Sequence, residues 1–312
     1  MLELVTLEPD FHRLFTLLSV HRVMLADELR VARFAAALRQ AVRPGDLVID
    51  VGTGTGLLAF LALQAGARHV IAIEATSVVE VAAEVARDNG WQDRITFIRA
   101  NADEVSLSER ADLVVSETIG HLGVAEQFLS TIIHGRSAFL RPGGALIPEE
   151  ISVWVAPVDS PAAYAPVSSW DERVAGVSFS AARRFAATQA YICRFAAEQM
   201  LAPPTCLVTL PLAHLDSSVL TLRSRVTAAR AGTLHGLCVW FDARLHRDVT
   251  LSTSPWAQPT HWQQAFLPLD ATIDIDSGTV LDVSLNFDDH RNPQLTWAVS
   301  SRRPSRRTAG MP

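Results

Sequence analysis

Cysteine is scarce in this sequence, and its scarcity excludes two common ways of stabilising or equipping a fold. The three cysteines, Cys193, Cys206 and Cys238, are an odd number and lack the close spacing of metal ligands. Neither a disulfide framework nor a metal site is therefore indicated. Unpaired thiols fit a reducing compartment, so we expect a cytoplasmic protein without a metal.

Long apolar runs and an excess of positive charge are also missing. The first residues, MLELVTLEPDFHRL, carry acids where a signal peptide has basic residues, and no later apolar run approaches the roughly 18 residues of a membrane span. We therefore expect neither export nor membrane insertion. The formal net charge of -6 disfavours non-specific nucleic-acid binding and suits a cationic or zwitterionic substrate.

The first half of the chain alternates between helical and extended patterns. Apolar residues recur at helical intervals over 22–42, and the short apolar strand Leu47–Val51 then opens into a glycine turn and a helix rich in leucine and alanine. The further elements expected here are strands at 69–74, 95–99 and 111–116 and a helix over 77–88. This alternation is typical of a parallel sheet with helices on both faces.

The pattern changes after a turn at 141–144 and Pro148. Strands are expected beyond it at 151–155, 205–210, 219–226, 237–241 and 280–286. One helix is expected among them, over 180–200. We therefore place a domain boundary near residue 150, followed by a β-barrel or sandwich, and expect the polar segment 301–312 to be disordered.

The glycine turn gives the first indication of a ligand. Its spacing is Asp50-x-Gly52-x-Gly54-x-Gly56, which differs from the G-x-G-x-x-G of dinucleotide-binding folds. Glycine lets the backbone approach a ligand closely, because it has no side chain and tolerates positive φ. The spacing favours S-adenosylmethionine, which has no pyrophosphate for such a turn to hold.

Two acidic residues at strand ends support this interpretation. Glu74 ends the second strand, where a carboxylate can accept hydrogen bonds from both ribose hydroxyls, and Asp103 follows the third, within reach of an adenine amino group. Either residue alone could be an ordinary solvent-facing acid. Their occurrence together with the glycine turn favours a cofactor site.

Four segments, in the right order, resemble the protein arginine methyltransferase family. They are HRVMLADELR, VIDVGTGTGLLAFLALQAGARHVIAIEAT, SETIGHLGVAEQF and STSPWAQPTHWQQAF. The third holds two glutamates nine positions apart, and the fourth holds Thr260, His261 and Trp262. The resemblance covers nearly the whole chain. It implies an α/β fold in which a Rossmann-like class I methyltransferase domain is followed by a β-barrel domain with a helical dimerisation arm.

The resemblance implies four parts within the chain. They are a helical segment covering the cofactor over 1–45, a Rossmann-like S-adenosylmethionine-binding domain over 46–149, a β-barrel domain over 150–300 with its helical arm near 180–200, and the tail over 301–312. The arm implies a homodimer.

The resemblance also implies roles for the site residues. Glu117 and Glu126 bind a guanidinium and fix one of its nitrogens in line with the methyl group. His261, oriented by Asp27, accepts or relays the proton. Arg30 pairs with the methionine carboxylate of the cofactor. The residues expected to bind the cofactor are Phe11, His21, Met24, Arg30, Asp50, Gly52, Gly54, Glu74 and Asp103.

The sequence departs from the family in two segments. The family's Tyr-Phe-x-x-Tyr segment is FHRLF at 11–15, and its Trp-Met-Gly-Tyr after the first glutamate is TIGH at 118–121. The arginine channel is thus less aromatic, which favours a small guanidino substrate. Some bacterial relatives methylate free L-arginine in natural-product pathways such as that of streptozotocin. We expect the same N-methylation here, with S-adenosylhomocysteine as the other product, and expect the bulk of Phe128 to hinder a second methylation.

Several alternatives stay open at this point. The substrate could be arginine in a peptide, or the chain could be a non-catalytic regulatory member that binds cofactor or a partner. Retention of both glutamates and of the Thr-His-Trp segment argues against the regulatory alternative. The glycine spacing disfavours an oxidoreductase, and the acidic charge balance disfavours a nucleic-acid methyltransferase.

Overall fold

A computed structural model describes residues 3–5, 15–289 and 294–302. Phe11 and the segment 303–312, where disorder was expected, lie outside the described residues. Ser301 and Arg302, the first residues of the expected tail, instead belong to the strand β17 (Gln294–Arg302). No helix among the described residues is long and apolar enough to cross a membrane.

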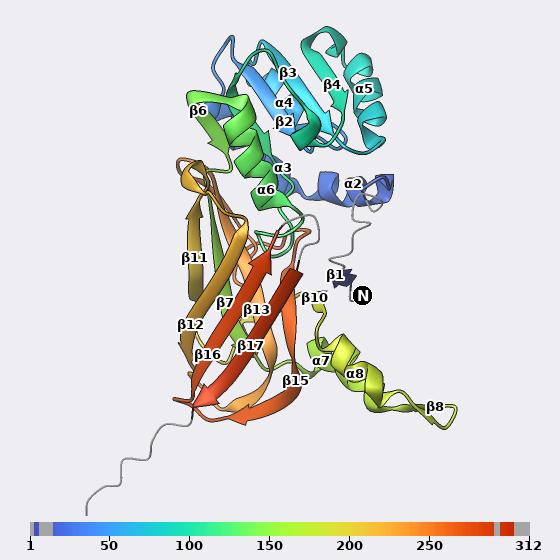
Figure 1. Cartoon of the computed structure of the whole chain (residues 1–312), viewed down its shortest axis with the longest axis vertical. Helices are drawn as coiled ribbons and strands as arrows, with labels where there is room; N and C mark the ends of the chain where they lie inside the picture. Colours follow the sequence, from blue (N-terminus) through green and yellow to red (C-terminus); the bar gives the residue numbers. More distant parts are fainter. Residues whose placement is uncertain (1–2, 6–14, 290–293, 303–312) are drawn as a thin grey trace, which may run out of the picture.

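The α/β half is built on five parallel strands in the order β4-β3-β2-β5-β6 (Figure 1). The strands are β2 (Leu47–Val51), β3 (His69–Glu74), β4 (Ile95–Arg99), β5 (Ala111–Ser116) and β6 (Leu140–Ile147). The central strands β2 and β5 are almost wholly buried, as expected for a parallel sheet covered on both faces. The α/β fold class and its first four strands are therefore confirmed.

The fifth strand, β6, includes the residues at 141–144 where a turn was expected. Pro142, Gly143 and Gly144 lie within this strand, and its pairing with β5 shifts register between Ala111 and Leu113. Such an irregularity lets an edge strand include residues that interrupt a regular ladder. The pairing passes from Ala111 with Leu140 to Leu113 with Ala145, so three extra residues leave the ladder here, and Gly143 has φ 74°. The turn signal in the sequence therefore marks an interruption within the strand and not its boundary.

Helices α4 (Leu57–Gln64) and α5 (Val78–Asp88) pack against β2, β3 and β4. The single helix expected over 22–42 is wrong, because the structure has α2 (Leu18–Ala26) and α3 (Glu28–Ala41) in its place. Asp27 separates them, and its side chain accepts a hydrogen bond of 3.0 Å from the Arg30 amide. This is an N-cap, which starts a new helix by satisfying one of its free amides.

The second half forms an antiparallel, barrel-like domain, as the fold-class prediction required. The path β1-β10-β15-β13-β7-β11 makes one sheet, to which β14 is added, and β12-β16-β17 makes another. The strands not yet bounded are β1 (Glu3–Val5), β7 (Glu150–Val158), β10 (Ala190–Cys193), β11 (Thr205–Pro211), β12 (Val219–Thr227), β13 (Gly232–His246), β14 (Val249–Ser252), β15 (Gln264–Ile275) and β16 (Val280–Asp288). Helix α3 packs against β13 and β14, which joins the two halves.

An arm projects from the barrel domain (Figure 1). It contains α7 (Pro161–Ser168), the hairpin strands β8 (Arg173–Val174) and β9 (Val177–Ser178), and α8 (Arg183–Ala186). The helix expected over 180–200 is therefore wrong in extent. Residues 190–193 are buried and extended, because their backbone pairs with β1 and β15 on either side. Tertiary pairing overrides the local helical pattern there.

Candidate active site

The site lies where β2 and β5 end side by side. Val51 and Ser116 are in register, so the glycine turn and Glu117 leave the sheet at adjacent points. The strand order reverses here, since β3 lies on one side of β2 and β5 on the other. In open α/β sheets such a switch point forms the ligand crevice.

The glycine turn is shaped by contacts that exclude side chains. Gly52, Gly54 and Gly56 all have positive φ, at 76°, 55° and 89°. A Cβ at Gly52 would collide with Thr118 Cγ2, and one at Gly54 would lie 2.9 Å from His21 Cε1. The turn can therefore approach a ligand closely only because these positions are glycine.

Asp50 stabilises this turn through hydrogen bonds. Its Oδ2 accepts hydrogen bonds from Thr53 Oγ1 (2.7 Å) and from the Ala59 amide (3.0 Å), while Oδ1 is buried with no partner among the described residues. Burial raises the pKa of the Asp50 carboxyl to about 7, against those two hydrogen bonds. The structure thus gives Asp50 a role in holding the turn, while its expected contact with the cofactor stays a prediction.

Glu74 closes the other side of the turn. Its Oε2 accepts from the Gly54 amide at 3.0 Å and its Oε1 from the Thr76 amide at 2.8 Å, and the residue is 8% exposed. Asp103 is exposed in the 3-10 turn after β4, the strand that pairs with β3. The Glu74 carboxylate therefore lies beside the glycine turn, and Asp103 follows the neighbouring strand. This arrangement fits an adenosyl group, so these residues can hold S-adenosylmethionine.

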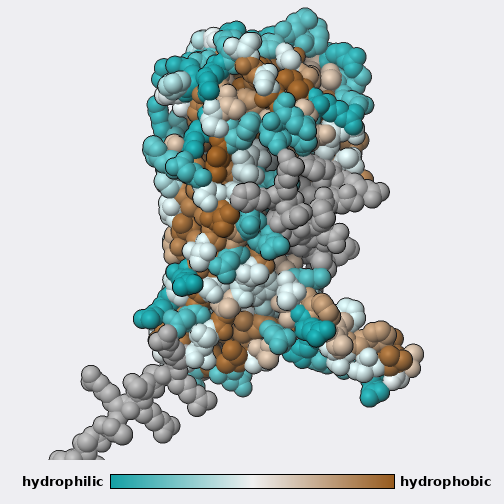
Figure 2. All heavy atoms as spheres, viewed as in Figure 1, coloured by the Kyte–Doolittle hydropathy of each residue, from teal (hydrophilic) through white to brown (hydrophobic). Residues whose placement is uncertain are grey.

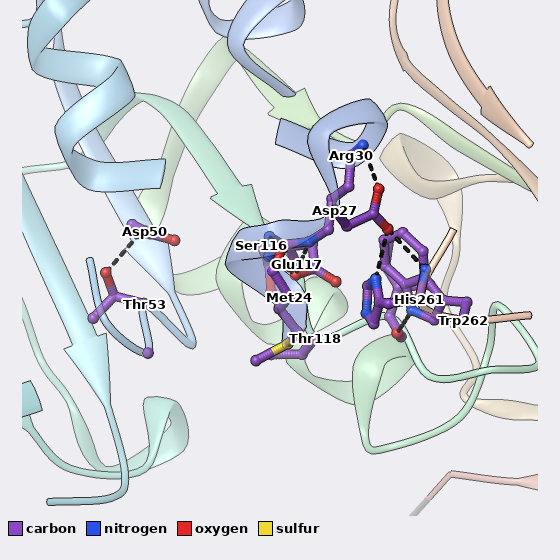
Figure 3. Close-up of polar contacts among 12 residues, drawn as sticks. Met24, Asp27, Arg30, Asp50, Thr53, Ser116, Glu117, Thr118, His261 and Trp262 are labelled. Atoms are coloured by element: carbon purple, nitrogen blue, oxygen red, sulfur yellow. Dashed lines mark hydrogen bonds and ion pairs between the residues drawn. The ribbon is translucent and has the colours of Figure 1, made fainter. Parts of the chain in front are cut away.

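Arg30, from α3, and Glu117, directly after β5, form a buried ion pair (Figure 3). Arg30 Nε donates to Glu117 Oε2 at 2.9 Å, Nη2 donates to the same oxygen, and Nη1 donates to the Met24 carbonyl at 3.2 Å. The structure therefore brings Arg30 to a catalytic candidate. Its expected contact with the cofactor carboxylate stays a prediction, as do the cofactor contacts of Met24 and His21.

Asp27 and His261 meet as the sequence predicted (Figure 3). Asp27 Oδ2 accepts from His261 Nδ1 at 2.9 Å and from the His261 amide at 2.8 Å. Burial alone would raise the pKa of the Asp27 carboxyl, but hydrogen bonds from His261 and from the Arg30 amide outweigh it and lower the pKa. Because Nδ1 donates to the carboxylate, the lone pair of the neutral imidazole is on Nε2 of His261.

Glu126 lies at the far end of the same loop, close enough to Glu117 for the charge of one to affect the other. Its backbone is left-handed at φ 66°, and a Cβ at Gly120 would lie 2.8 Å from Glu126 Cγ, so the loop folds back tightly on itself. Burial, with the charges of Glu117 and Asp289, raises the pKa of the Glu126 carboxyl to about 8. Two carboxylates in one partly buried site disfavour each other's charge and favour a cationic ligand.

The Thr-His-Trp segment fixes this loop by two reciprocal bonds that the sequence did not reveal. His121 Nδ1 donates to the Trp262 carbonyl at 2.7 Å, and Trp262 Nε1 donates to the Ile119 carbonyl at 2.7 Å. Burial lowers the pKa of His121 to about 4, so the imidazole is neutral at physiological pH. The family resemblance places a tyrosine at position 121, and it gave no indication of the hydrogen bond from His121 to the Trp262 carbonyl. Thr260 is buried beside it.

Comparisons with known proteins identify the family of the chain. Residues 149–300 match the arginine methyltransferase oligomerization subdomain, and residues 35–148 match the family model described as ribosomal protein L11 methyltransferase (PrmA). The chain is 30% identical over 298 residues to protein arginine N-methyltransferase 6 of Xenopus tropicalis, covering 90% of this chain and 87% of that protein.

Two solved structures extend the likeness to three dimensions. The Trypanosoma brucei PRMT1 enzyme-prozyme heterotetrameric complex with AdoHcy has a TM-score of 0.82 and 25% identity, covering 93% of this chain and 99% of that chain. Arabidopsis thaliana protein arginine methyltransferase 10 has a TM-score of 0.78, with 22% identity over 93% of this chain and 99% of that chain. The predictions of family and cofactor are confirmed: the chain belongs to the protein arginine methyltransferase family and is an S-adenosylmethionine-dependent arginine N-methyltransferase.

Proposed function

We propose that the chain methylates a terminal guanidino nitrogen of arginine within a protein or peptide. The observation that carries this proposal is the pair Glu117 and Glu126, two carboxylates in one partly buried loop whose mutual repulsion a cationic guanidinium would relieve. Relatives similar over most of the chain are named protein arginine N-methyltransferases, which favours the peptide alternative over the free L-arginine expected from the sequence.

The two carboxylates hold the substrate and disperse its charge. Both Arg30 contacts go to Glu117 Oε2, so Oε1 is available to accept from a guanidinium N–H. Glu126 supplies the second acceptor, and the cation in turn lowers the pKa of Glu126 and favours its ionised form. When bound, S-adenosylmethionine supplies an electrophilic methyl group on a sulfonium sulfur. Carboxylates fixed beforehand then stabilise the positive charge that develops on the guanidino group.

The proton released by the methylated guanidinium needs an acceptor. His261 offers the lone pair of Nε2, because its Nδ1 donates to Asp27. Asp27 also caps α3, whose Arg30 holds Glu117. The orientation of the proton acceptor and the position of the substrate acceptor therefore depend on the same helix start.

The test supplies S-adenosylmethionine with an arginine-rich peptide in one reaction and free L-arginine in another, with products identified by mass spectrometry. We expect methylarginine in the peptide from the wild-type protein, and its loss in Glu117→Gln. Glu109→Gln, which changes an exposed glutamate paired with Arg68, is the control and should retain full activity. Methylation of free L-arginine without methylation of the peptide would refute the peptide proposal.

A second candidate, free L-arginine in natural-product biosynthesis, rests on the substituted loop. Thr118 packs over Gly52, and His121 is committed to the Trp262 carbonyl, so neither supplies the aromatic wall that the family has there. The free L-arginine reaction of the same experiment tests this candidate. Phe128 is fully buried beside this loop, and the restriction to one methyl group remains a hypothesis that methylation counts in Phe128→Met would check.

We also propose a homodimer located in the cytoplasm. The arm exposes large apolar side chains, namely Trp170, Val174, Val177, Phe179 and Phe185. Figure 2 shows hydrophobic residues among polar ones on this projection. Exposed apolar residues gathered on one projection are typical of a surface that another protein covers. The match of 149–300 to an oligomerization subdomain supports this. The three cysteines are free thiols, which suits a reducing compartment.

A further inference from the structure

Asp289 is a fully buried carboxylate that neither the sequence motifs nor the mechanism includes. It follows β16, in the barrel domain, at 0% exposure. Its Oδ1 accepts from the Gln127 amide at 2.7 Å, and its Oδ2 accepts from the Leu129 amide at 2.8 Å and the Ser130 amide at 3.3 Å. A carboxylate from the second domain thus caps the start of α6 (Phe128–His134) in the first.

The backbone at this helix start needs such support. Gln127, at the N-cap position, makes no side-chain capping bond, and it is left-handed at φ 61° directly after Glu126 at φ 66°. A left-handed residue other than glycine is strained, and such strain persists only where the surroundings enforce it. Asp289 provides that enforcement, because it binds three amides of the segment that begins immediately after Glu126.

We propose that Asp289 is a positioning residue for catalysis, which holds the left-handed turn so that the Glu126 carboxylate faces Glu117. The inference rests on the proposed role of these two glutamates. It makes the geometry of the guanidinium site depend on the end of a barrel strand about 160 residues further along the chain.

The charge of Asp289 gives this role a signature that simple structural support lacks. Among the described residues, the charges that raise the pKa of Glu126 belong to Glu117, in the loop after β5, and Asp289, at the end of β16. Arg30 offsets the charge of Glu117 through their ion pair, and His121, from the same loop, is neutral. Asp289 therefore opposes ionisation of Glu126, and its replacement by a neutral residue must lower the pKa of Glu126 below about 8.

The experiment compares Asp289→Asn, which keeps one acceptor oxygen and removes the charge, with Asp289→Ala, which removes both. Asp288→Asn, at the neighbouring residue of β16, is the matched control. With the arginine-rich peptide as substrate, we expect kcat to fall at least tenfold in Asp289→Ala, while Kd for S-adenosylmethionine changes less than twofold. In Asp289→Asn the acid limb of the pH profile of kcat/KM should move to lower pH. An unmoved limb, or equal losses in kcat and cofactor affinity, would overturn the proposal.

A second measurement does not depend on activity. Carbon-13 NMR of glutamate side-chain carboxyls follows the titration of Glu126, whose signal is the one missing in Glu126→Gln. We expect that titration to move to lower pH in Asp289→Asn and to stay in place in Asp288→Asn. If the wild-type protein methylates neither peptide nor free arginine, the proposed function fails, while this titration still decides whether Asp289 acts on Glu126.

Discussion

The buried pair of Arg30 and Glu117 gives a prediction whose size follows from exposure. Their side chains are 7% and 6% exposed, whereas those of Arg68 and Glu109 are 48% and 60% exposed. Removing one partner of a buried pair leaves an uncompensated charge and costs about 3–5 kcal/mol, whereas exposed pairs contribute about 0–1 kcal/mol. Glu117→Gln should fall at the lower end of the first range, about 3 kcal/mol, because the amide oxygen still accepts from Arg30.

Urea unfolding followed by circular dichroism measures this difference. For a slope of about 3 kcal/mol per molar urea, Glu117→Gln should lower the midpoint by about 1 M, and the control Glu109→Gln by no more than about 0.3 M. Adding Arg30→Met to Glu117→Gln removes the stranded charge and should restore at least half of the lost stability. Equal midpoint shifts for Glu117→Gln and Glu109→Gln would refute the reasoning, because they would mean that the pair is not desolvated.

Three further predictions concern the glycine turn, the Asp50 carboxyl that stabilises it, and the arm. Gly54→Ala should weaken S-adenosylmethionine binding at least tenfold by calorimetry, because of its positive φ and the close His21 ring, whereas Gly143→Ala, with positive φ but no atom within 4 Å, should leave it unchanged. Asp50 has a folded-state pKa of about 7 against 3.8 when unfolded, so the folded protein holds a proton that the unfolded chain has lost, and stability contributed by this group falls as pH rises between these values. Asp50→Asn should flatten that dependence, and melting curves from pH 4 to 8 that fall in parallel with those of the wild type would contradict the assignment. Val177→Asp combined with Phe185→Asp should halve the mass measured by light scattering, while Trp256→Asp, at an exposed apolar residue outside the arm, should not; an unchanged dimer in the arm variant would exclude the arm as the contact.

The parts of the site that could be predicted from sequence are those that depend on local pattern. The strand before the glycine turn, the spacing of that turn and Glu74 at the next strand end all lie within residues 47–74, and strand order then brings them together. The meeting of Asp27 with His261 was available only through the family resemblance, since 234 residues separate them. Their hydrogen bond shows that family motifs can predict a long-range contact that composition does not predict.

The parts that could not be predicted depend on tertiary packing. Nothing near Asp289 marks it as the cap of a helix 160 residues earlier, and nothing near His121 indicates its bond to the Trp262 carbonyl. The break at Asp27 did leave a signal, because an aspartate before Glu28 is a helix-start pattern that the longer apolar periodicity obscured. The strand Ala190–Cys193 shows the opposite case, in which neighbouring strands decide the conformation of an ambiguous apolar segment.

The cap that Asp289 places on α6 has a consequence for synthesis of the chain. The glycine turn, both glutamates and the helix they precede have all left the ribosome long before residue 289 is made, so a nascent chain can complete the parallel sheet while its catalytic loop still lacks its last anchor. Truncated or stalled products would then hold the methyl donor without presenting an ordered acceptor for arginine. Activity thus requires that the chain has been made and folded at least as far as residue 289.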